Sequence, residues 1–133
     1  MFATQLEKTG SILIVDDNMN FVDRIIMLLE DIKEHIHVMV ASDFDEAKRV
    51  LIHEKPEIAL LDINLPGKNG IDLLRYIREK NEKCEVIMIT NHADEYYRQQ
   101  CIDLGAKHFL DKSNDFAQVP TLVNHYLKLN SGK

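Results

Sequence analysis

Ser11-Ile-Leu-Ile-Val15 is an apolar run that ends directly at two acidic residues, Asp16 and Asp17. Three later apolar runs end in the same way, at a carboxylate, a hydroxyl and an ammonium: Ile58-Ala-Leu-Leu61 before Asp62, Val86-Ile-Met-Ile89 before Thr90, and His108-Phe-Leu110 before Asp111-Lys112. Short apolar runs separated by helical stretches are typical of a buried parallel sheet. Ligands of such sheets bind at the carboxyl ends of the strands, so these polar residues are expected to share one edge.

The rest of the chain supports an α/β fold with one domain. Apolar residues at helical spacing lie between the strand-like runs, and a further short run covers 37–41. Helices between successive strands force parallel pairing through right-handed crossovers. We therefore predict a doubly wound, flavodoxin-like sheet of five parallel strands in the order 2-1-3-4-5, forming one domain over 1–133 with a core over about 11–129. This order places Asp16, Asp17 and Asp62 together and brings Thr90 and Lys112 beside them.

Composition excludes several classes of protein. The formal net charge of -6 over 133 residues argues against direct nucleic-acid binding, which needs a basic surface. No apolar run is long enough to span a membrane, and residues 1–8 lack the apolar stretch of a signal peptide. Cys84 and Cys101 fit no CxxC pattern, so we expect reduced thiols in a cytoplasmic protein.

The residue types at the strand ends suit a divalent cation and a phosphoryl group. Carboxylates that lie close together repel each other, and a hard dication such as Mg²⁺ relieves that repulsion. Asp16 and Asp17 are candidate Mg²⁺ ligands, and Asp62 is a candidate for both ligand and nucleophile, because aspartate forms acyl-phosphates. Lys112 would offset the charge of the transferred group, and Thr90 would donate a hydrogen bond to it.

At these residues the sequence resembles the receiver domain of two-component response regulators. The matching pieces cover nearly the whole chain: Ile12-Leu-Ile-Val-Asp-Asp-Asn18, Leu60-Leu-Asp-Ile-Asn-Leu-Pro66 with Gly70, Val86-Ile-Met-Ile-Thr90 and Phe109-Leu-Asp-Lys112. The resemblance implies that Asp62 is the phosphoacceptor and that the backbone carbonyl of Asn64 joins Asp16, Asp17 and Asp62 around Mg²⁺. It also implies that Thr90 is the switch hydroxyl, Lys112 the phosphate-pairing lysine and Phe109 the switch aromatic, whose ring moves inward.

Three positions depart from the usual pattern of that family. Ser113 replaces the proline that often follows the lysine, so no cis-proline is expected. Asn91 is larger than the small residue usual after the threonine and narrows access to Asp62. Phe109 lacks the hydroxyl of the more usual tyrosine. None of these changes removes a reacting group.

The resemblance implies a phospho-switch in two-component signal transduction or a phosphorelay. Asp62 would accept a phosphoryl group from a phosphohistidine of a histidine kinase or phosphotransfer protein. The chain would act as no enzyme beyond its own phosphorylation and slow autodephosphorylation. We favour a single-domain regulator over the front of a longer one, and continuation of the native polypeptide past Lys133 would decide between them.

Two other functions suit the same fold. A flavodoxin-like cofactor binder needs a phosphate loop after the first strand, where Asp16 and Asp17 would instead repel a phosphate. An aspartyl phosphatase commonly has a second acid two positions after its nucleophile, and this chain has Asn64 there. A colourless protein that binds Mg²⁺ and turns over no phosphoester would exclude both.

Three further surfaces are assigned from position and resemblance. An exposed aromatic at the start of the first helix would anchor the kinase, in a docking set of Phe21, Arg24 and Leu28. The signal would leave through helix 4, strand 5 and helix 5, to a downstream protein or a second copy, over Tyr96, Tyr97, Arg98, His108 and Tyr126. The phosphoryl lifetime would depend on residues at the mouth of the site, namely Asn64, Asn91 and His92.

Overall fold

The computed structural model describes residues 10–30, 32, 36–80, 83–91 and 94–131. Five strands alternate with five α-helices, and a short 3₁₀ helix precedes the last one. The strands are β1 (Gly10–Val15), β2 (Ile36–Ala41), β3 (Ile58–Leu61), β4 (Glu85–Thr90) and β5 (His108–Asp111). The helices are α1 (Met19–Leu28), α2 (Phe44–Glu54), α3 (Gly70–Lys80), α4 (Glu95–Asp103), η2 (Phe116–Gln118) and α5 (Val119–Ser131).

The strands form one parallel sheet in the order β2-β1-β3-β4-β5, as predicted. Val15 pairs with Ala41 on one side and with Leu61 on the other, so β1, β2 and β3 end at the same level. Thr90 pairs with Asp111 at the end of β4 and β5. The residues that follow each strand are therefore delivered to one edge of the sheet, as the carboxyl-end rule requires.

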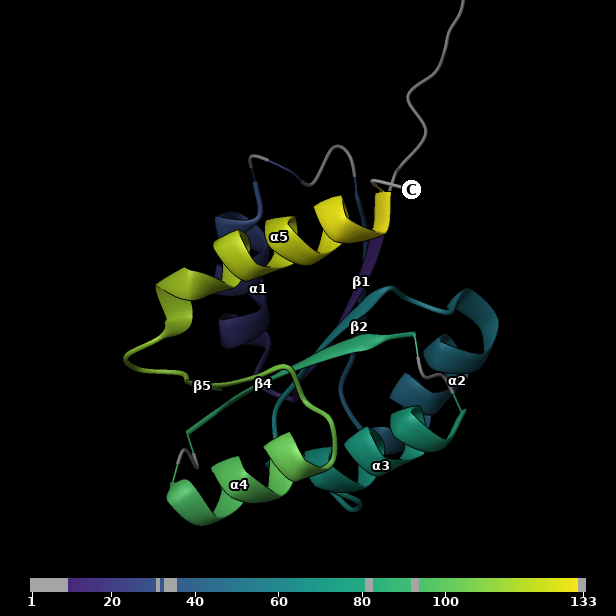
Figure 1. Ribbon diagram of the computed structural model, residues 1–133, viewed down its shortest axis with the longest axis vertical. Helices are drawn as coiled ribbons and strands as arrows, with labels where there is room; N and C mark the ends of the chain where they lie inside the picture. The colour runs from purple at the N-terminus through teal and green to yellow at the C-terminus, as the bar shows by residue number, and fades with distance from the viewer. Residues whose placement is uncertain (1–9, 31, 33–35, 81–82, 92–93, 132–133) are drawn as a thin grey trace, which may run out of the picture.

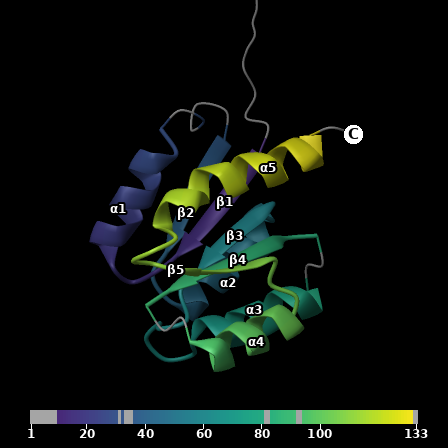
Figure 2. The same cartoon turned by 60° about the vertical axis from the view of Figure 1, so that its left-hand side comes forward.

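Helices cover both faces of the sheet. Figures 1 and 2 show α1 and α5 on one face and α2, α3 and α4 on the other. Alternate strand residues point to opposite faces. Ile12 and Ile14 accordingly join the core under α1 and α5, whereas Leu13 and Val15 join the core under the other three helices.

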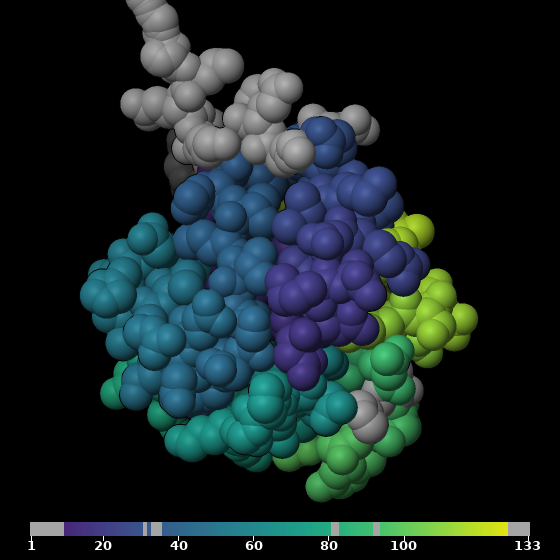
Figure 3. All heavy atoms as spheres, turned by 180° about the vertical axis from the view of Figure 1, so that it is seen from behind, coloured from purple at the N-terminus to yellow at the C-terminus, as the bar shows by residue number. Residues whose placement is uncertain are grey.

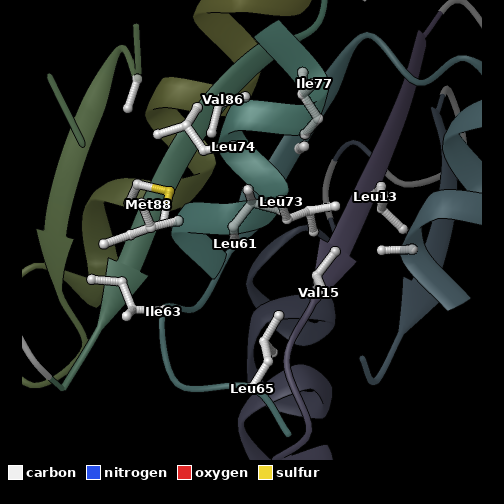
Figure 4. Packing of buried hydrophobic residues seen from close by; sticks show 14 of the residues in the cluster. Leu13, Val15, Leu61, Ile63, Leu65, Leu73, Leu74, Ile77, Val86 and Met88 are labelled. Carbon is white, nitrogen blue, oxygen red and sulfur yellow. The ribbon is translucent and has the colours of Figure 1, made fainter. Parts of the chain in front are cut away.

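The core under α2, α3 and α4 extends into the loop that follows β3. Figure 4 shows Ile63 and Leu65 of this loop among the side chains of the sheet and of α3. Ile63 is 5% and Leu65 is 7% exposed. Burial of these two residues fixes the loop immediately after Asp62, which is the residue predicted to react.

Cys84 and Cys101 are free thiols buried in the core, and burial raises the pKa of Cys84 to about 12 and of Cys101 to about 11. Within the described part of the chain, every helix is too short or too polar to cross a membrane.

Candidate functional site

Asp16 and Asp62 are fixed by the sheet that they follow. The backbone N–H of Asp16 donates to the carbonyl of Ala41 at 3.0 Å, and that of Asp62 donates to the carbonyl of Val15 at 3.0 Å. Asp16 is 1% and Asp62 is 5% exposed, whereas Asp17 is exposed. Two buried carboxylates therefore lie at the ends of neighbouring strands, with a third at the surface beside them.

Lys112 reaches the buried carboxylates from the end of β5. Its Nζ lies 2.7 Å from Asp16 Oδ2 and 3.3 Å from Asp62 Oδ2, and its side chain is 9% exposed. Its backbone N–H donates to the carbonyl of Thr90 at 3.1 Å. One ammonium thus links residues that are far apart in the sequence, as the strand order predicted.

Burial and neighbouring charges act in opposite directions on Asp16. Burial raises the pKa of Asp16 above its ordinary value, and the charge of Asp62 raises it further. The hydrogen bonds from Lys112 and from the backbone N–H of Asn18, the latter at 2.9 Å, lower it in part. The net effect is a pKa of Asp16 above its ordinary value, with burial as the main cause.

The acidic residues form a donor set that suits a hard cation. Asp16, Asp17 and Asp62 each offer a carboxylate oxygen, and these oxygens lie within 4.8 Å of one another. Asp62 Oδ1 is buried, and no described residue forms a hydrogen bond with it. Oxygen ligands with an excess of negative charge fit Mg²⁺. Asn64, whose carbonyl is the remaining predicted ligand, is exposed in the loop after β3.

Gly70 brings the start of α3 against the backbone of Asp62. A Cβ at Gly70 would lie 1.9 Å from the Asp62 carbonyl oxygen, closer than any side chain permits. The Gly70 N–H also donates to the carbonyl of Ile63 at 2.8 Å. The helix itself is capped by Asn69, whose Oδ1 accepts from the N–H groups of Ile71 and Asp72. This close approach gives a physical reason for a glycine in the matched motif.

Thr90 and Phe109, the two residues predicted to form a switch, are both buried. Thr90 ends β4 and is fully buried, and Phe109 is 3% exposed in the core under α4. The Cζ atom of Arg98 lies 5.2 Å from the Phe109 ring centroid. The ring therefore occupies an inward position beneath a guanidinium. Asn91 is exposed, and His92 lies outside the described residues.

The expectation that Phe21 is an exposed docking residue is wrong. Phe21 is 5% exposed, because its ring packs against Phe116 of η2 at 5.9 Å between centroids. Arg24 is exposed and Leu28 is partly buried. No sequence pattern pointed to Phe116, because its contact with α1 depends on how the segment before α5 folds.

The five residues predicted for signal output lie on α4, β5 and α5, in two groups. Tyr96 is 72% exposed and contacts Tyr97 ring to ring at 5.4 Å. His108 Nε2 lies 2.8 Å from the hydroxyl of Tyr126, which joins β5 to α5. Arg98, which covers Phe109, lies on the same helix as the two tyrosines.

The edge of the sheet beside Lys112 is hollowed. A hollow of about 420 Å³ is lined by residues from α1 and from the segments after β4 and β5, among them Asn18, Arg24, Asn91, Lys112 and Ser113. Figure 3 shows this side of the molecule, with the purple start of α1 beside the green and yellow-green segments after β4 and β5. The peptide bonds of the described residues are all trans, including the one between Lys112 and Ser113.

Comparison with known proteins agrees with this geometry. The family model for the response regulator receiver domain matches residues 12–124. Sporulation initiation phosphotransferase F of Bacillus subtilis is 31% identical over 122 residues, which are 90% of this chain and 95% of that protein. The transcriptional regulatory protein CpxR of Klebsiella pneumoniae is 36% identical over 103 residues, 77% of this chain but only 43% of that protein.

Solved structures show the same fold. The CheY-like receiver domain protein of Methanospirillum hungatei superposes with a TM-score of 0.80 at 26% identity, covering 90% of this chain and 94% of the other. The BeF3-activated receiver domain of Klebsiella pneumoniae RstA gives a TM-score of 0.79 at 27% identity, covering 90% and 99%.

Proposed function

Because this chain belongs to the response regulator receiver domain family, we propose that Asp62 accepts a phosphoryl group from a phosphohistidine. The donor is a histidine kinase or a histidine phosphotransfer protein. The observation that carries the proposal is the contact of the Lys112 ammonium with Asp16 Oδ2 and Asp62 Oδ2, beside a buried Asp62 Oδ1 that has no partner among the described residues. A nucleophile, a cation and a second carboxylate thus meet at one point.

The transfer exchanges one bond for another at phosphorus. A carboxylate oxygen of Asp62 forms the new bond to phosphorus while the bond from phosphorus to the imidazole nitrogen breaks, and the imidazole leaves with the electron pair. Lys112 offsets the negative charge of the phosphoryl oxygens, and the Thr90 hydroxyl donates a hydrogen bond to one of them. Mg²⁺, bound by Asp16, Asp17, Asp62 and the Asn64 carbonyl, would neutralise further charge.

The signal then leaves through the α4–β5–α5 surface. Movement of Thr90 towards the phosphoryl group alters its contacts at the end of β4, which pairs with β5. Phe109 lies on β5 under Arg98, so a change at this strand reaches α4 directly. The same strand contacts α5 through His108 and Tyr126. The partner at this surface is a downstream protein or a second copy of the chain.

The proposal confines catalysis to the chain's own phosphorylation and slow dephosphorylation. Residues at the mouth of the site, Asn64, Asn91 and His92, would set how fast water reaches the acyl-phosphate. Arg24 and Leu28 remain proposed contacts for the kinase, without Phe21. The curated relatives include proteins much longer than this chain. We do not propose for this chain the activities of the additional parts of those proteins.

The proposal is tested by intact-mass spectrometry after incubation with a small phosphodonor and Mg²⁺. The wild-type chain should gain one phosphoryl group, and Asp62→Asn should gain none because the amide is a poor nucleophile. Asp23→Asn makes the same chemical change at an exposed residue of α1 and should be modified like wild type. Full phosphate addition to Asp62→Asn would refute the assignment.

A further inference from the structure

Phe21 contacts the ammonium that pairs the reacting carboxylates. Lys112 Nζ lies 4.3 Å from the Phe21 ring centroid, well within the range of a cation–π interaction. The same nitrogen contacts Asp16 Oδ2 at 2.7 Å and Asp62 Oδ2 at 3.3 Å. The ammonium is therefore enclosed by two carboxylates and an aromatic face, and its side chain is only 9% exposed.

The Phe21 ring also packs against a second aromatic ring. Phe116 packs against it with ring centroids 5.9 Å apart and planes inclined at 54°. The Cζ atom of Arg24 lies 4.4 Å from the Phe116 ring centroid. A chain of contacts thus connects Lys112 to Phe21, Phe21 to Phe116, and Phe116 to the exposed Arg24.

The flexible Lys112 side chain gains a further contact from this ring, beside the two carboxylates that pair with its ammonium. A lysine has a flexible four-carbon stem and a strongly hydrated ammonium, so it loses considerable freedom when it is fixed. The hydrogen bond from its backbone to Thr90 fixes the strand end and not the ammonium. A ring face attracts the cation without demanding one direction, and it excludes the water that would weaken the pairing with the carboxylates.

We propose that Phe21 is a positioning residue for phosphoryl transfer, which holds the Lys112 ammonium dry and close to Asp62 while the charge there changes. The inference rests on the proposed function. When the phosphoryl group arrives, the ammonium shifts from Asp16 towards the new oxygens, and contact with the ring persists because cation–π attraction is broad in angle. Phe21 therefore acts through Lys112 and does not touch the reacting atoms.

The chain offers a matched control for this test. Phe44 on α2 is also a buried aromatic, and Lys68 Nζ lies 4.8 Å from its ring centroid. Tyr76 packs against Phe44 at 6.1 Å, much as Phe116 packs against Phe21. Phe44→Leu therefore removes a buried ring with one cation and one aromatic neighbour, in the core on the opposite face of the sheet from Phe21.

The first measurement is the rate of phosphorylation by a small phosphodonor at saturating Mg²⁺. Phe21→Leu should lower this rate by about tenfold, and Phe21→Tyr, which keeps the ring face, should restore it to within about twofold of wild type. Phe44→Leu should stay within about twofold of wild type even if it destabilises the fold equally. Equal losses in Phe21→Leu and Phe44→Leu would overturn the proposal.

A double-mutant cycle tests whether Phe21 acts through Lys112. In a Lys112→Met background, Phe21→Leu should cause no further loss of rate, because the ammonium that it positions is gone. The same fold-loss in both backgrounds would overturn the proposal and assign Phe21 to general packing.

A second readout does not depend on phosphorylation. The ring current of Phe21 should shift the proton resonances of the Lys112 methylene next to Nζ upfield in the unmodified protein. Phe21→Leu should remove that shift and Phe44→Leu should leave it. Absence of the shift in wild type would overturn this inference alone, whereas failure of wild type to accept phosphate, with the shift present, would overturn only the proposed function.

Discussion

Asp17 is the exposed member of the acidic cluster, and this difference from Asp16 and Asp62 defines what it can do. The two buried residues already contact Lys112, whereas Asp17 faces solvent beside them. An exposed carboxylate costs little to keep charged, and a cation can reach it directly from solvent. Asp17 is thus the acidic residue through which cation binding can be altered with least damage to the fold.

At this residue we predict a loss of Mg²⁺ binding in Asp17→Asn. Mg²⁺ at about a hundred times its Kd should raise the free energy of unfolding of wild type by about 2.7 kcal/mol, because it binds only the folded chain. At the same concentration the gain in Asp17→Asn should be at least about 1 kcal/mol smaller. Chemical denaturation with and without Mg²⁺ measures both gains. Asp23→Asn is the control, and equal gains in all three proteins would contradict the assignment.

The strand-end residues of the site could be predicted from the sequence, whereas the burial of Phe21 could not. The five candidate site residues follow from polar residues at strand ends, because a parallel sheet brings those ends together. Phe21 has no comparable signal, since an aromatic residue at a helix start is equally compatible with exposure and burial. Its burial follows from Phe116, whose position depends on the 3₁₀ helix before α5. Contacts between such distant segments are set by tertiary packing.

At the scale of elements, α3 is the helix that holds Asp62 and the loop after it in place. It begins at Gly70 against the backbone of Asp62, and its cap, Asn69, satisfies the first free N–H groups. Ile63 and Leu65 anchor the intervening loop in the core. The position of Asp62 therefore depends on packing of a helix end as well as on β3.

We predict that Gly70→Ala destabilises the fold and slows modification of Asp62 together. The added Cβ would lie 1.9 Å from the Asp62 carbonyl oxygen, so the two backbone segments would have to move apart. We expect this to lower the free energy of unfolding by about 3 kcal/mol. Gly67→Ala is the control, because a Cβ at Gly67 would contact nothing. The substitution is opposed only by the backbone, whose φ of 75° is unfavourable for residues other than glycine. That change should cost about 1 kcal/mol and leave the rate of phosphorylation unchanged. Urea denaturation and the phosphorylation rate together separate the two effects, and equal costs at both glycines would contradict this account.

Element boundaries were predicted less well than element order. Phe21 was expected at the start of the first helix, whereas α1 covers Met19–Leu28 and begins two residues earlier. Asn18 caps it by accepting a hydrogen bond from the N–H of Phe21, so the helix begins earlier than its apolar stripe. Apolar periodicity reports the buried face of a helix, and its ends depend on caps and on turns that the periodicity does not record.

At the scale of the whole molecule, β5 connects the edge of the sheet that carries the acidic cluster to α4 and α5. Lys112 follows it at the carboxyl end, Phe109 faces α4, and His108 contacts Tyr126 of α5. The strand order that was predicted from the sequence made β5 an edge strand. An edge strand with its own contacts to α4 and α5 is a suitable route from a buried charge to a surface, which is why we place the output there.

The contact between β5 and α5 should make stability depend on pH. Burial lowers the pKa of His108, and the positive charges of His125 and Lys107 lower it further. Lys107 Nζ also lies 4.0 Å from Glu85 Oε1. Burial raises the pKa of Tyr126, and the negative charge of Glu85 raises it further. Because the pKa of His108 is lower in the folded chain, the unfolded chain binds more protons between the folded value and about 6.5. Stability from this histidine is therefore present above that window and is lost as the pH falls through it.

We predict that His108→Gln reduces the loss of stability on acidification while keeping a polar group for Tyr126 to contact. Urea denaturation at about pH 8 and about pH 5 should show a smaller drop in the free energy of unfolding for His108→Gln than for wild type. His53→Gln changes an exposed histidine on α2 and should behave like wild type. If both variants lose as much stability as wild type, proton uptake at His108 does not link β5 to α5. A smaller loss in His108→Gln alone would mean that mild acid loosens the surface through which we propose that the phosphorylated chain signals.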